Sequence, residues 1–277
     1  MELTVEHDTT YAYETAPRYS IQYLRLRPQQ SAHQNVWKWR VTAPDTLTTF
    51  RDGFGNDVEV LALTKPPQSF TISVRGRVTT ASNAGVQPED ADTLPPALFL
   101  RSTALTASDD ALRDLAERPS ARGGPAAIAE RLAERVGTTI EYRAGVTGSA
   151  TSAAQALAIG AGVCQDHTHV LLACCRARGI PARYVSGYYW GDPSGKEYEA
   201  NHAWAEVFVG GTGWIGFDPA NRRRVDDNYV RLAHGLDYLD AAPARGMRRG
   251  GGMETLSVRV RVADAAAGGQ SQAQSQQ

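Results

Sequence analysis

The sequence predicts an α+β protein, in which an antiparallel, sandwich-like β domain precedes a core of helices packed on an antiparallel sheet. Two observations predict this. Within residues 1 to about 80, apolar and polar residues alternate in short runs that are separated by turn residues, with no helical stretch between them. Helical periodicity then appears before a second set of strand-like runs, an order typical of α+β folds and not of alternating parallel units.

Composition excludes several classes of protein. Charged residues make up 21% and hydrophobic residues 42% of the 277 residues, as in ordinary globular proteins of one or two domains. The net charge of -1 provides no broad basic field for nucleic acid, and no apolar run reaches the roughly 20 residues of a membrane-spanning helix. We therefore expect neither nucleic acid nor a membrane as a partner.

The expected compartment is the cytoplasm. The segment from Met1 to His7 has neither the basic start nor the apolar stretch of a signal peptide. Three cysteines, an odd number, favour reduced thiols over a disulfide framework.

The alternating runs of the first domain end before a connection at 81–96 that is rich in Ala, Ser, Asn, Gly, Asp and Pro. We therefore predict a β domain at 1–85, a core at 86–263 and a disordered, low-complexity tail at 264–277. The runs predicted as strands in the first domain are 9–13, 19–27, 35–41, 58–63 and 70–78.

Four helices are expected in the core. After a first helix near 109–115, a second begins at Pro125 and stops at Gly137, and a third runs from about Ser152 to Gly160. The fourth has Cys164 in its first turn and ends before Gly179. Strands are expected at 183–189, 202–208 and 212–218, with a late run at 256–262.

Cys164 is the first residue that could carry chemistry. The unpaired N–H groups and the positive dipole end of a helix stabilise a thiolate, which is the nucleophilic form of cysteine. The alternative interpretation is a small buried side chain, and it applies to Cys174 and Cys175 deeper in the same helix.

His202 and Asp218 are separated by an even number of residues, with a glycine-rich turn between them. A hairpin whose three-residue loop is centred on Gly210, with Gly211 left-handed, places the two residues directly opposite each other on one face. A two-residue turn would break this pairing. Taken singly, His202 could be a structural histidine and Asp218 a turn former.

Together the three residues form a thiol–imidazole–carboxylate set, the arrangement used for covalent acyl transfer. Here the sequence resembles the transglutaminase-like superfamily, a branch of the papain-like fold, over nearly the whole chain. The resemblance is carried by Gly162-Val163-Cys164-Gln165-Asp166, the segment 181–188, His202-Ala203-Trp204-Ala205-Glu206 and the segment 214–221. Segments 7–13, 24–28 and 52–56 resemble the β-rich amino-terminal region of bacterial members, and 235–238 and 242–246 resemble the segment after the core.

The resemblance implies that Cys164 is the nucleophile, that His202 is general base and then general acid, and that Asp218 orients His202, with no cofactor. The backbone N–H of Cys164 is the natural first oxyanion donor. Tyr142 is the candidate second donor, and a core tyrosine is the alternative.

Four more residues are candidates for the oxyanion site or the surroundings of the triad: Gln165, Asp166, Trp204 and Glu206. Asp166 either caps the helix start or binds a substrate amine. Trp204 either lines the cleft or is a core residue, and Glu206 either supports the triad or is an exposed strand carboxylate.

A zinc site built from His167 and His169 with Cys164 and His202 is not expected. Residues two apart on a helix point away from each other, and the sequence offers no second close-spaced pair of ligands. We therefore expect no metal.

These patterns favour thiol-dependent hydrolysis or acyl transfer on amide bonds of peptides or protein glutamines, through a thioester at Cys164. The resemblance to bacterial members favours hydrolysis over crosslinking, with a peptide or protein as substrate, and leaves the oligomeric state open. The alternatives are a catalytically inert binding or scaffold module and a metal-dependent hydrolase.

Overall fold

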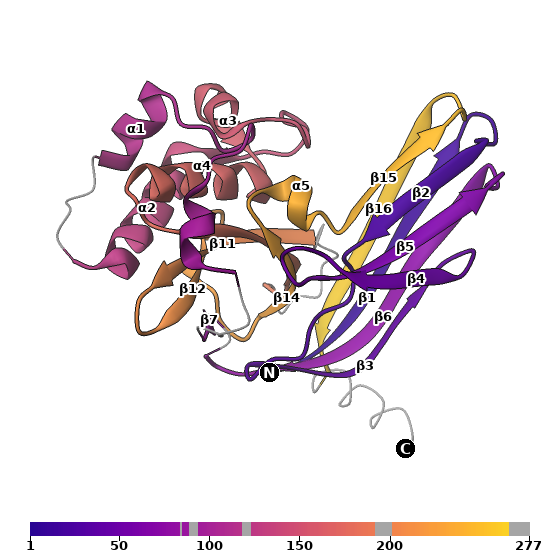
Figure 1. Cartoon of the computed structure of the whole chain (residues 1–277), viewed down its shortest axis with the longest axis horizontal. Coiled ribbons are helices and arrows are strands. Elements are labelled where there is room, and N and C mark those ends of the chain that lie inside the picture. The colour runs from indigo at the N-terminus through magenta and orange to yellow at the C-terminus, as the bar shows by residue number, and fades with distance from the viewer. Residues whose placement is uncertain (84, 89–93, 118–122, 192–200, 266–277) are drawn as a thin grey trace, which may run out of the picture.

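A computed structural model describes residues 1–83, 85–88, 94–117, 123–191 and 201–265. The helices gather at one end of the molecule and a long β sandwich forms the other (Figure 1). The predicted α+β class, with helices on an antiparallel sheet and a separate strand-rich region, is confirmed. The predicted tail lies outside the described residues from 266 onward.

The sandwich consists of two four-stranded antiparallel sheets, ordered β16-β1-β6-β3 and β15-β2-β5-β4. Leu3, Val5, Tyr11 and other alternate residues of β1 are buried, because successive side chains of a strand point to opposite faces. The strands are β1 (Glu2–Tyr13), β2 (Tyr19–Leu24), β3 (Gln34–Thr42), β4 (Leu47–Arg51), β5 (Asp57–Thr64), β6 (Ser69–Thr80), β15 (Ala244–Arg249) and β16 (Glu254–Asp264).

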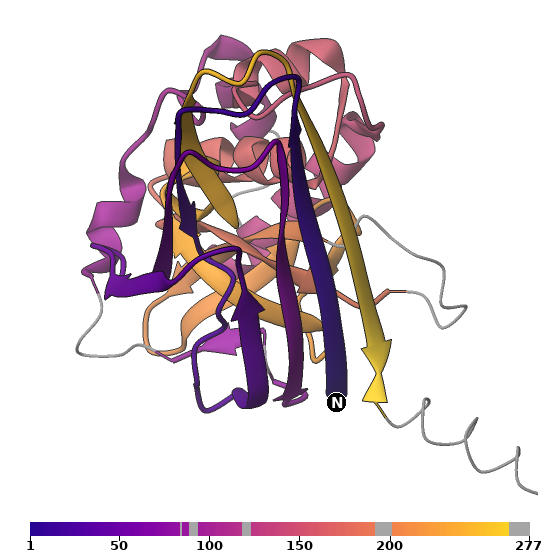
Figure 2. The same cartoon turned by 90° about the vertical axis from the view of Figure 1, so that its right-hand side faces the viewer.

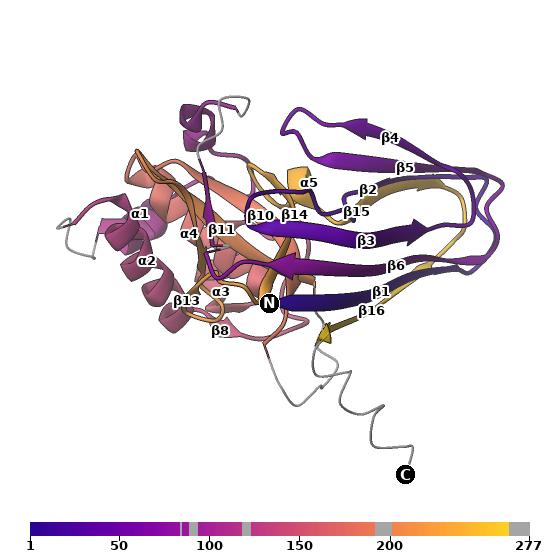
Figure 3. The same cartoon turned by 90° about the horizontal axis from the view of Figure 1, so that it is seen from below.

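The two last strands depart from the predicted division of the chain. The run 256–262, which we assigned to the core, belongs to β16 and pairs with β1 from Leu3 opposite Asp264 to Tyr13 opposite Glu254. β15 pairs in the same way with β2, and Figures 2 and 3 show both beside the amino-terminal strands. Without β16, β1 would be an open edge with unpaired backbone groups, and an alternating pattern does not say which strand covers such an edge.

The core packs its helices on one face of a sheet ordered β13-β12-β11-β10-β14, with β7 paired to β12. Ala203, Ala205 and Val207 of β11 share a hydrophobic cluster with Val170 and Leu171 of α4. The helices are α1 (Asp110–Glu117), α2 (Pro125–Thr139), α3 (Ala153–Ile159), α4 (Cys164–Ala177) and α5 (Tyr238–Ala241), with a 3₁₀ turn at Pro96–Leu100. The strands are β7 (Val86–Gln87), β10 (Ala182–Tyr189), β11 (Asn201–Val209), β12 (Gly213–Asp218), β13 (Arg223–Arg224) and β14 (Tyr229–Gly235), and β8 (Glu141–Tyr142) pairs with β9 (Ala161–Gly162).

Gly137 does not stop α2, as we predicted, because the helix continues to Thr139. A Cβ atom at Gly137 would lie 2.3 Å from the carbonyl oxygen of Pro219. This glycine therefore allows the helix to approach the loop that follows Asp218.

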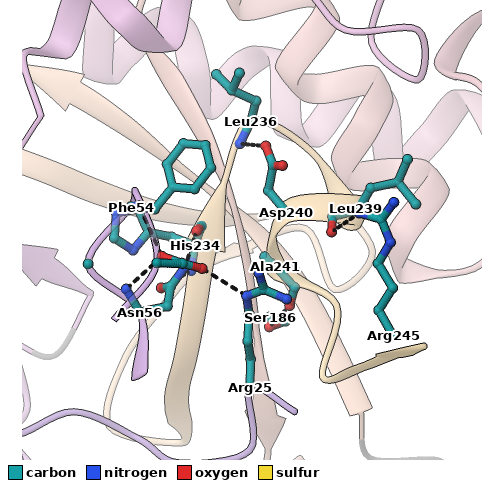
Figure 4. Close-up of polar contacts among 12 residues, drawn as sticks. Arg25, Phe54, Asn56, Ser186, His234, Leu236, Leu239, Asp240, Ala241 and Arg245 are labelled. Atoms are coloured by element: carbon teal, nitrogen blue, oxygen red, sulfur yellow. Dashed lines mark hydrogen bonds and ion pairs between the residues drawn. The ribbon is translucent and has the colours of Figure 1, made fainter. Parts of the chain in front are cut away.

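Polar contacts join the sandwich to the core at the loop 52–56 (Figure 4). Asn56 donates from Nδ2 to the carbonyl of His234 at 2.8 Å and accepts from its N–H at 2.9 Å. Asp52 accepts from the N–H groups of Phe54 and Asn56, and from Nε of Arg25 at 3.0 Å. The loop thus extends the hydrogen bonding of β14 into the sandwich. Close by, in the same view, the backbone of Leu236 donates to Asp240.

Arg176 near the end of α4 is a buried cation that holds several segments together. Its guanidinium donates to the carbonyls of Phe99, Ala182 and Leu236 at 2.7–3.2 Å and to the hydroxyl of Thr106 at 2.8 Å. Burial lowers its pKa to about 10, so the group stays charged at neutral pH.

We expect Arg176→Ala to lower the free energy of unfolding by about 3 kcal/mol or more, because it removes a donor from three buried acceptors and from the part-buried carbonyl of Leu236. The matched control is Arg178→Ala in the same region, since Arg178 donates only to the carbonyl of Ala116 among the contacts described. Urea unfolding followed by circular dichroism measures both. Equal losses in the two variants would contradict the role of Arg176.

Candidate active site

Cys164 is the first residue of α4, as predicted, and its side chain is half-buried. The sulfur lies 3.9 Å from the carbonyl oxygen of Asn201, at the start of β11. Cys174 and Cys175 are fully buried, and burial raises the pKa of the Cys174 thiol to about 12. Of the three thiols, that of Cys164 is therefore the accessible one.

His202 lies between the thiol and a carboxylate. Its Nε2 is 2.6 Å from Oδ2 of Asp218, and the neighbouring Cys164 is close enough to help raise the pKa of the imidazole. Because Asp218 occupies Nε2, Nδ1 is the ring nitrogen left for a proton exchange with the thiol. The structure thus brings together the three residues that the sequence singled out.

The hairpin register differs from the predicted one by one step. Val209 pairs with Gly213, so the three-residue loop is centred on Gly211, which is left-handed at φ +78°, and not on Gly210. In this register Asp218 falls opposite position 204 and reaches His202 along the diagonal, still on the same face. The physical reason is the cross-strand pair of Phe208 and Trp214, whose rings are 5.3 Å apart.

Asp218 is fully buried and surrounded by donors that sequence reasoning missed. Asn221 donates to it from its backbone N–H at 3.1 Å and from Nδ2 at 2.7 Å, and the hydroxyl of Tyr229 donates at 2.8 Å. The Asp-Pro-Ala-Asn turn is a signal that could have found Asn221. Tyr229 comes from β14, a strand that the sequence analysis did not predict.

The charges of this pair support each other. Burial by itself lowers the pKa of His202, but the charge and hydrogen bond of Asp218, together with Cys164, raise it to about 10. Burial raises the pKa of Asp218, and the His202 charge with the hydrogen bonds from His202, Asn221 and Tyr229 outweighs burial and brings the pKa below its ordinary value. At neutral pH the pair is therefore an imidazolium and a carboxylate.

Tyr142 belongs to β8, beside the start of α4, and is not a core residue. It pairs with Gly162 across β8 and β9, two positions before Cys164, and 54% of its surface is exposed. Its ring packs on that of His167, with centroids 6.1 Å apart. The alternative of a core tyrosine is thus wrong, and an oxyanion contact of Tyr142 stays a prediction. Gln165 is half-buried, and its amide reaches the carbonyl of Ser149 at 3.5 Å.

Asp166 caps the start of α4, one of its two predicted roles. Its Oδ2 accepts from the N–H of Val163 at 2.8 Å and from the hydroxyl of Thr147 at 2.7 Å, and the side chain is buried. Trp204 is a core residue, 1% exposed, whose ring packs edge-on against Tyr229.

Glu206 is not the exposed strand carboxylate considered above. It is 2% exposed and forms ion pairs with Arg183 at 2.6 Å and Arg231 at 2.9 Å. Alternation along β11 predicted its face correctly, but on this face two arginines of the neighbouring core strands cover the carboxylate.

The two histidines of α4 are held by the backbone. The ring nitrogens of His167 lie 2.9 and 3.0 Å from the carbonyls of Val163 and Ile140, and Nε2 of His169 accepts from the N–H of Tyr238. Within the described part of the chain, no three His, Cys, Asp or Glu side chains group as metal ligands would.

Sequence comparison identifies two regions of the chain. Residues 113–219 match the profile of the Transglutaminase-like superfamily, and residues 3–79 match that of the Bacterial transglutaminase-like N-terminal region. An uncharacterised protein of Mycobacterium tuberculosis H37Rv is 34% identical over 270 residues, which cover 88% of this chain and 86% of the relative. A protein-glutamine gamma-glutamyltransferase of Pseudomonas aeruginosa is 33% identical over 98 residues, which are 31% of this chain and 14% of that enzyme.

A solved structure from Cytophaga hutchinsonii, named "Putative Cysteine Protease", is similar over most of the chain. Its TM-score is 0.76 at 25% sequence identity, and the match covers 96% of this chain and 91% of that one. Fold and comparison together define a protein with the papain-like fold of cysteine proteases. Within this class, the chain belongs to the transglutaminase-like superfamily. In the described residues no helix combines the length and apolar character needed to cross a membrane.

We expect His202 to remain protonated on both ring nitrogens up to about pH 10, since Asp218 stabilises the imidazolium. Asp218→Asn removes this charge and should lower the pKa of His202 by at least one unit, a difference of about 1.4 kcal/mol. Nitrogen-15 NMR of the imidazoles measures both values. The control is Asp110→Asn, at an exposed carboxylate on α1. Titration of His202 near its ordinary value in the unmodified protein would contradict the expectation.

Proposed function

We propose that this protein is a thiol-dependent amidase or peptidase, in which Cys164 is the nucleophile, His202 the general base and acid, and Asp218 the residue that orients His202. The observation that carries the proposal is the 2.6 Å hydrogen bond between His202 and the buried Asp218, with the half-buried Cys164 thiol beside the same imidazole. Membership of the transglutaminase-like superfamily supports it.

The geometry supports a two-step reaction. The Cys164 thiolate attacks the carbonyl carbon of an amide, a sulfur–carbon bond forms, and the carbon–nitrogen bond breaks as His202 gives its proton to the leaving amine. Water then attacks the thioester while His202 accepts a proton from it. The sulfur–carbon bond breaks, which releases the acid and restores the thiolate–imidazolium pair.

The start of α4 is suited to the negative charge that forms on the carbonyl oxygen. The first N–H groups of a helix have no partner within the helix, and its dipole favours an anion there. Cys164 is the first residue of α4, so we assign its N–H as one oxyanion donor. Tyr142, exposed beside the same helix start, is the proposed second donor.

Water is the proposed acceptor of the acyl group. Cys164, His202 and Asp218 serve water and amines equally, but transfer to a second protein also requires a binding place for its amine. The proposed substrate is a peptide or a protein glutamine. The proposed setting is the cytoplasm, where the Cys164 thiol stays reduced.

We expect the protein, incubated with a library of glutamine-containing peptides and a free amine, to give products that Cys164→Ala does not give. Mass spectrometry separates the outcomes: deamidation adds about 1 Da, amine incorporation adds the amine minus ammonia, and proteolysis cleaves the backbone. The control is Cys174→Ala, at a buried thiol away from His202, which should keep the activity. Products formed equally by Cys164→Ala would refute the assignment of the nucleophile.

We expect iodoacetamide to alkylate Cys164 faster at pH 6 when His202 is present, because a positive charge beside the sulfur favours the attack on the reagent. His202→Ala should slow alkylation at pH 6 at least tenfold, while His33→Ala, in the sandwich, should leave it unchanged. The rate advantage should fade as the pH rises toward 10, where His202 loses its proton. A rate at pH 6 that does not depend on His202 would contradict an ion pair at this site.

A further inference from the structure

A cavity of about 1180 Å³ lies between the sandwich and the core, apart from the thiol site. Residues 27–32 and 51–55 line it on the sandwich side, and Arg183, Arg231 and His234 line it on the core side. Its volume is near that of ligand pockets, which occur preferentially where two domains meet. The loop 52–56, which the proposed reaction does not use, forms part of its wall.

On the core side of this cavity, two guanidinium groups form ion pairs with the same carboxylate. Nε of Arg183 donates to Glu206 Oε2 at 2.6 Å, and Arg231 donates from Nε to Oε1 at 2.9 Å and from Nη2 to Oε2 at 3.3 Å. The side chains of Arg183, Glu206 and Arg231 are 5%, 3% and 16% exposed. All three are charged, since burial lowers the pKa of Arg183 only to about 10 and the two arginines keep the pKa of Glu206 below its ordinary value despite its burial.

The remaining charged groups described at the cavity are paired one to one. Arg27 binds Glu59, Arg51 binds Asp57, and Asp52 binds Arg25. His234 adds no charge, because burial and the two nearby arginines lower its pKa well below the ordinary value. One positive charge is thus left over among these residues, and an uncompensated buried charge is costly.

The walls that carry this charge are held firmly. Gln34 of β3 accepts from the N–H of Arg231 at 2.8 Å and donates to its carbonyl at 2.9 Å. The guanidinium of Arg183 stacks on the ring of Trp214 at 4.2 Å. Phe54 packs against His234, as Figure 4 shows. These contacts fix the guanidinium groups before any ligand arrives, which reduces the entropy cost of binding.

We propose that this cavity binds a carboxylate ligand, whose anionic group is held at Arg183 and Arg231. Guanidinium groups pair with carboxylates through parallel hydrogen bonds, and a monoanion balances the single excess charge. Glu206 is four positions from His202 on β11, about 13 Å along a strand, so the site is separate from the thiol.

The test uses Cys164→Ala, so that binding is measured without turnover, and Arg231→Gln then separates binding in this cavity from binding of a glutamine derivative near residue 164. The probe is N-acetylglutamate α-amide, with one carboxylate, and N-acetylglutamine α-amide is its neutral isostere. Isothermal titration calorimetry should show saturable binding of the acid, and at least tenfold weaker binding of the amide. Equal binding of both, or of neither, would overturn the proposal, and tighter binding of inorganic phosphate would overturn the ligand class.

Arg231→Gln in the same background should weaken binding of the acid at least tenfold. Its matched control is Arg51→Gln, which removes the same charge at the exposed rim and should change binding less than twofold. Arg231→Gln leaves Arg183 and Glu206 as a balanced pair, so we expect it to fold, which thermal unfolding checks. Equal effects of the two substitutions would overturn the site.

Two further measurements test the site without Arg231→Gln. The ring resonances of His234 should shift when the acid is added and stay unchanged with the amide, and absence of a shift with the acid would overturn the site. The sequence between the lining residues Pro88 and Leu94 carries Glu89, Asp90 and Asp92. Binding by E89Q/D90N/D92N and not by its parent would also overturn the proposal.

Discussion

The buried hydrogen bond between His202 and Asp218 is the interaction on which the candidate site depends. A carboxylate with no solvent contact must be stabilised by donors, and Asp218 has three residues that donate to it. Asn221 comes from the turn after β12, and Tyr229 comes from β14, on the far side of β10. The hydrogen bonds to Asp218 therefore connect β11, the turn after β12, and β14. Because hydrogen bonds depend on direction as well as distance, they fix these elements more closely than a hydrophobic contact would.

The thiol is positioned by a different kind of constraint. The backbone of α4 positions Cys164. It is the first residue of a helix whose start is capped by Asp166 and flanked by β8 and β9. At the other end, Gly179 takes the left-handed conformation and the N–H of Ile180 returns to the carbonyl of Cys175. With both ends of the helix fixed and its inner face packed on β11, the sulfur and the imidazole meet without a strained backbone at either residue.

Local signals in the sequence predicted more of the site than of the fold around it. The start of α4 at Cys164 and its end before Gly179 follow from periodicity and from glycine, and an even separation was enough to put His202 and Asp218 on one face. The predicted register was wrong because several glycines allow two similar loops, and the packing of Phe208 on Trp214 favours the observed one. Pairing partners that are far apart in sequence, such as β1 with β16, leave no local trace because alternation specifies a face and not a neighbour.

The burial of Glu206 could not be predicted either, because alternation does not show which residues cover a face. Its position on β11 relates the arginine pair to the catalytic candidates at the other end of the strand. His202, Trp204 and Glu206 share one face of the strand, so the imidazolium pair and the arginine pair lie on either side of the buried Trp204 ring. At a separation of about 13 Å and an effective dielectric constant of about 20, the repulsion energy between one excess positive charge and the imidazolium is about 1 kcal/mol. This repulsion favours the neutral imidazole, and an anion held by Arg183 and Arg231 would cancel it. An anion bound as we propose would therefore raise the pKa of His202 through the field alone, without any movement of the strand.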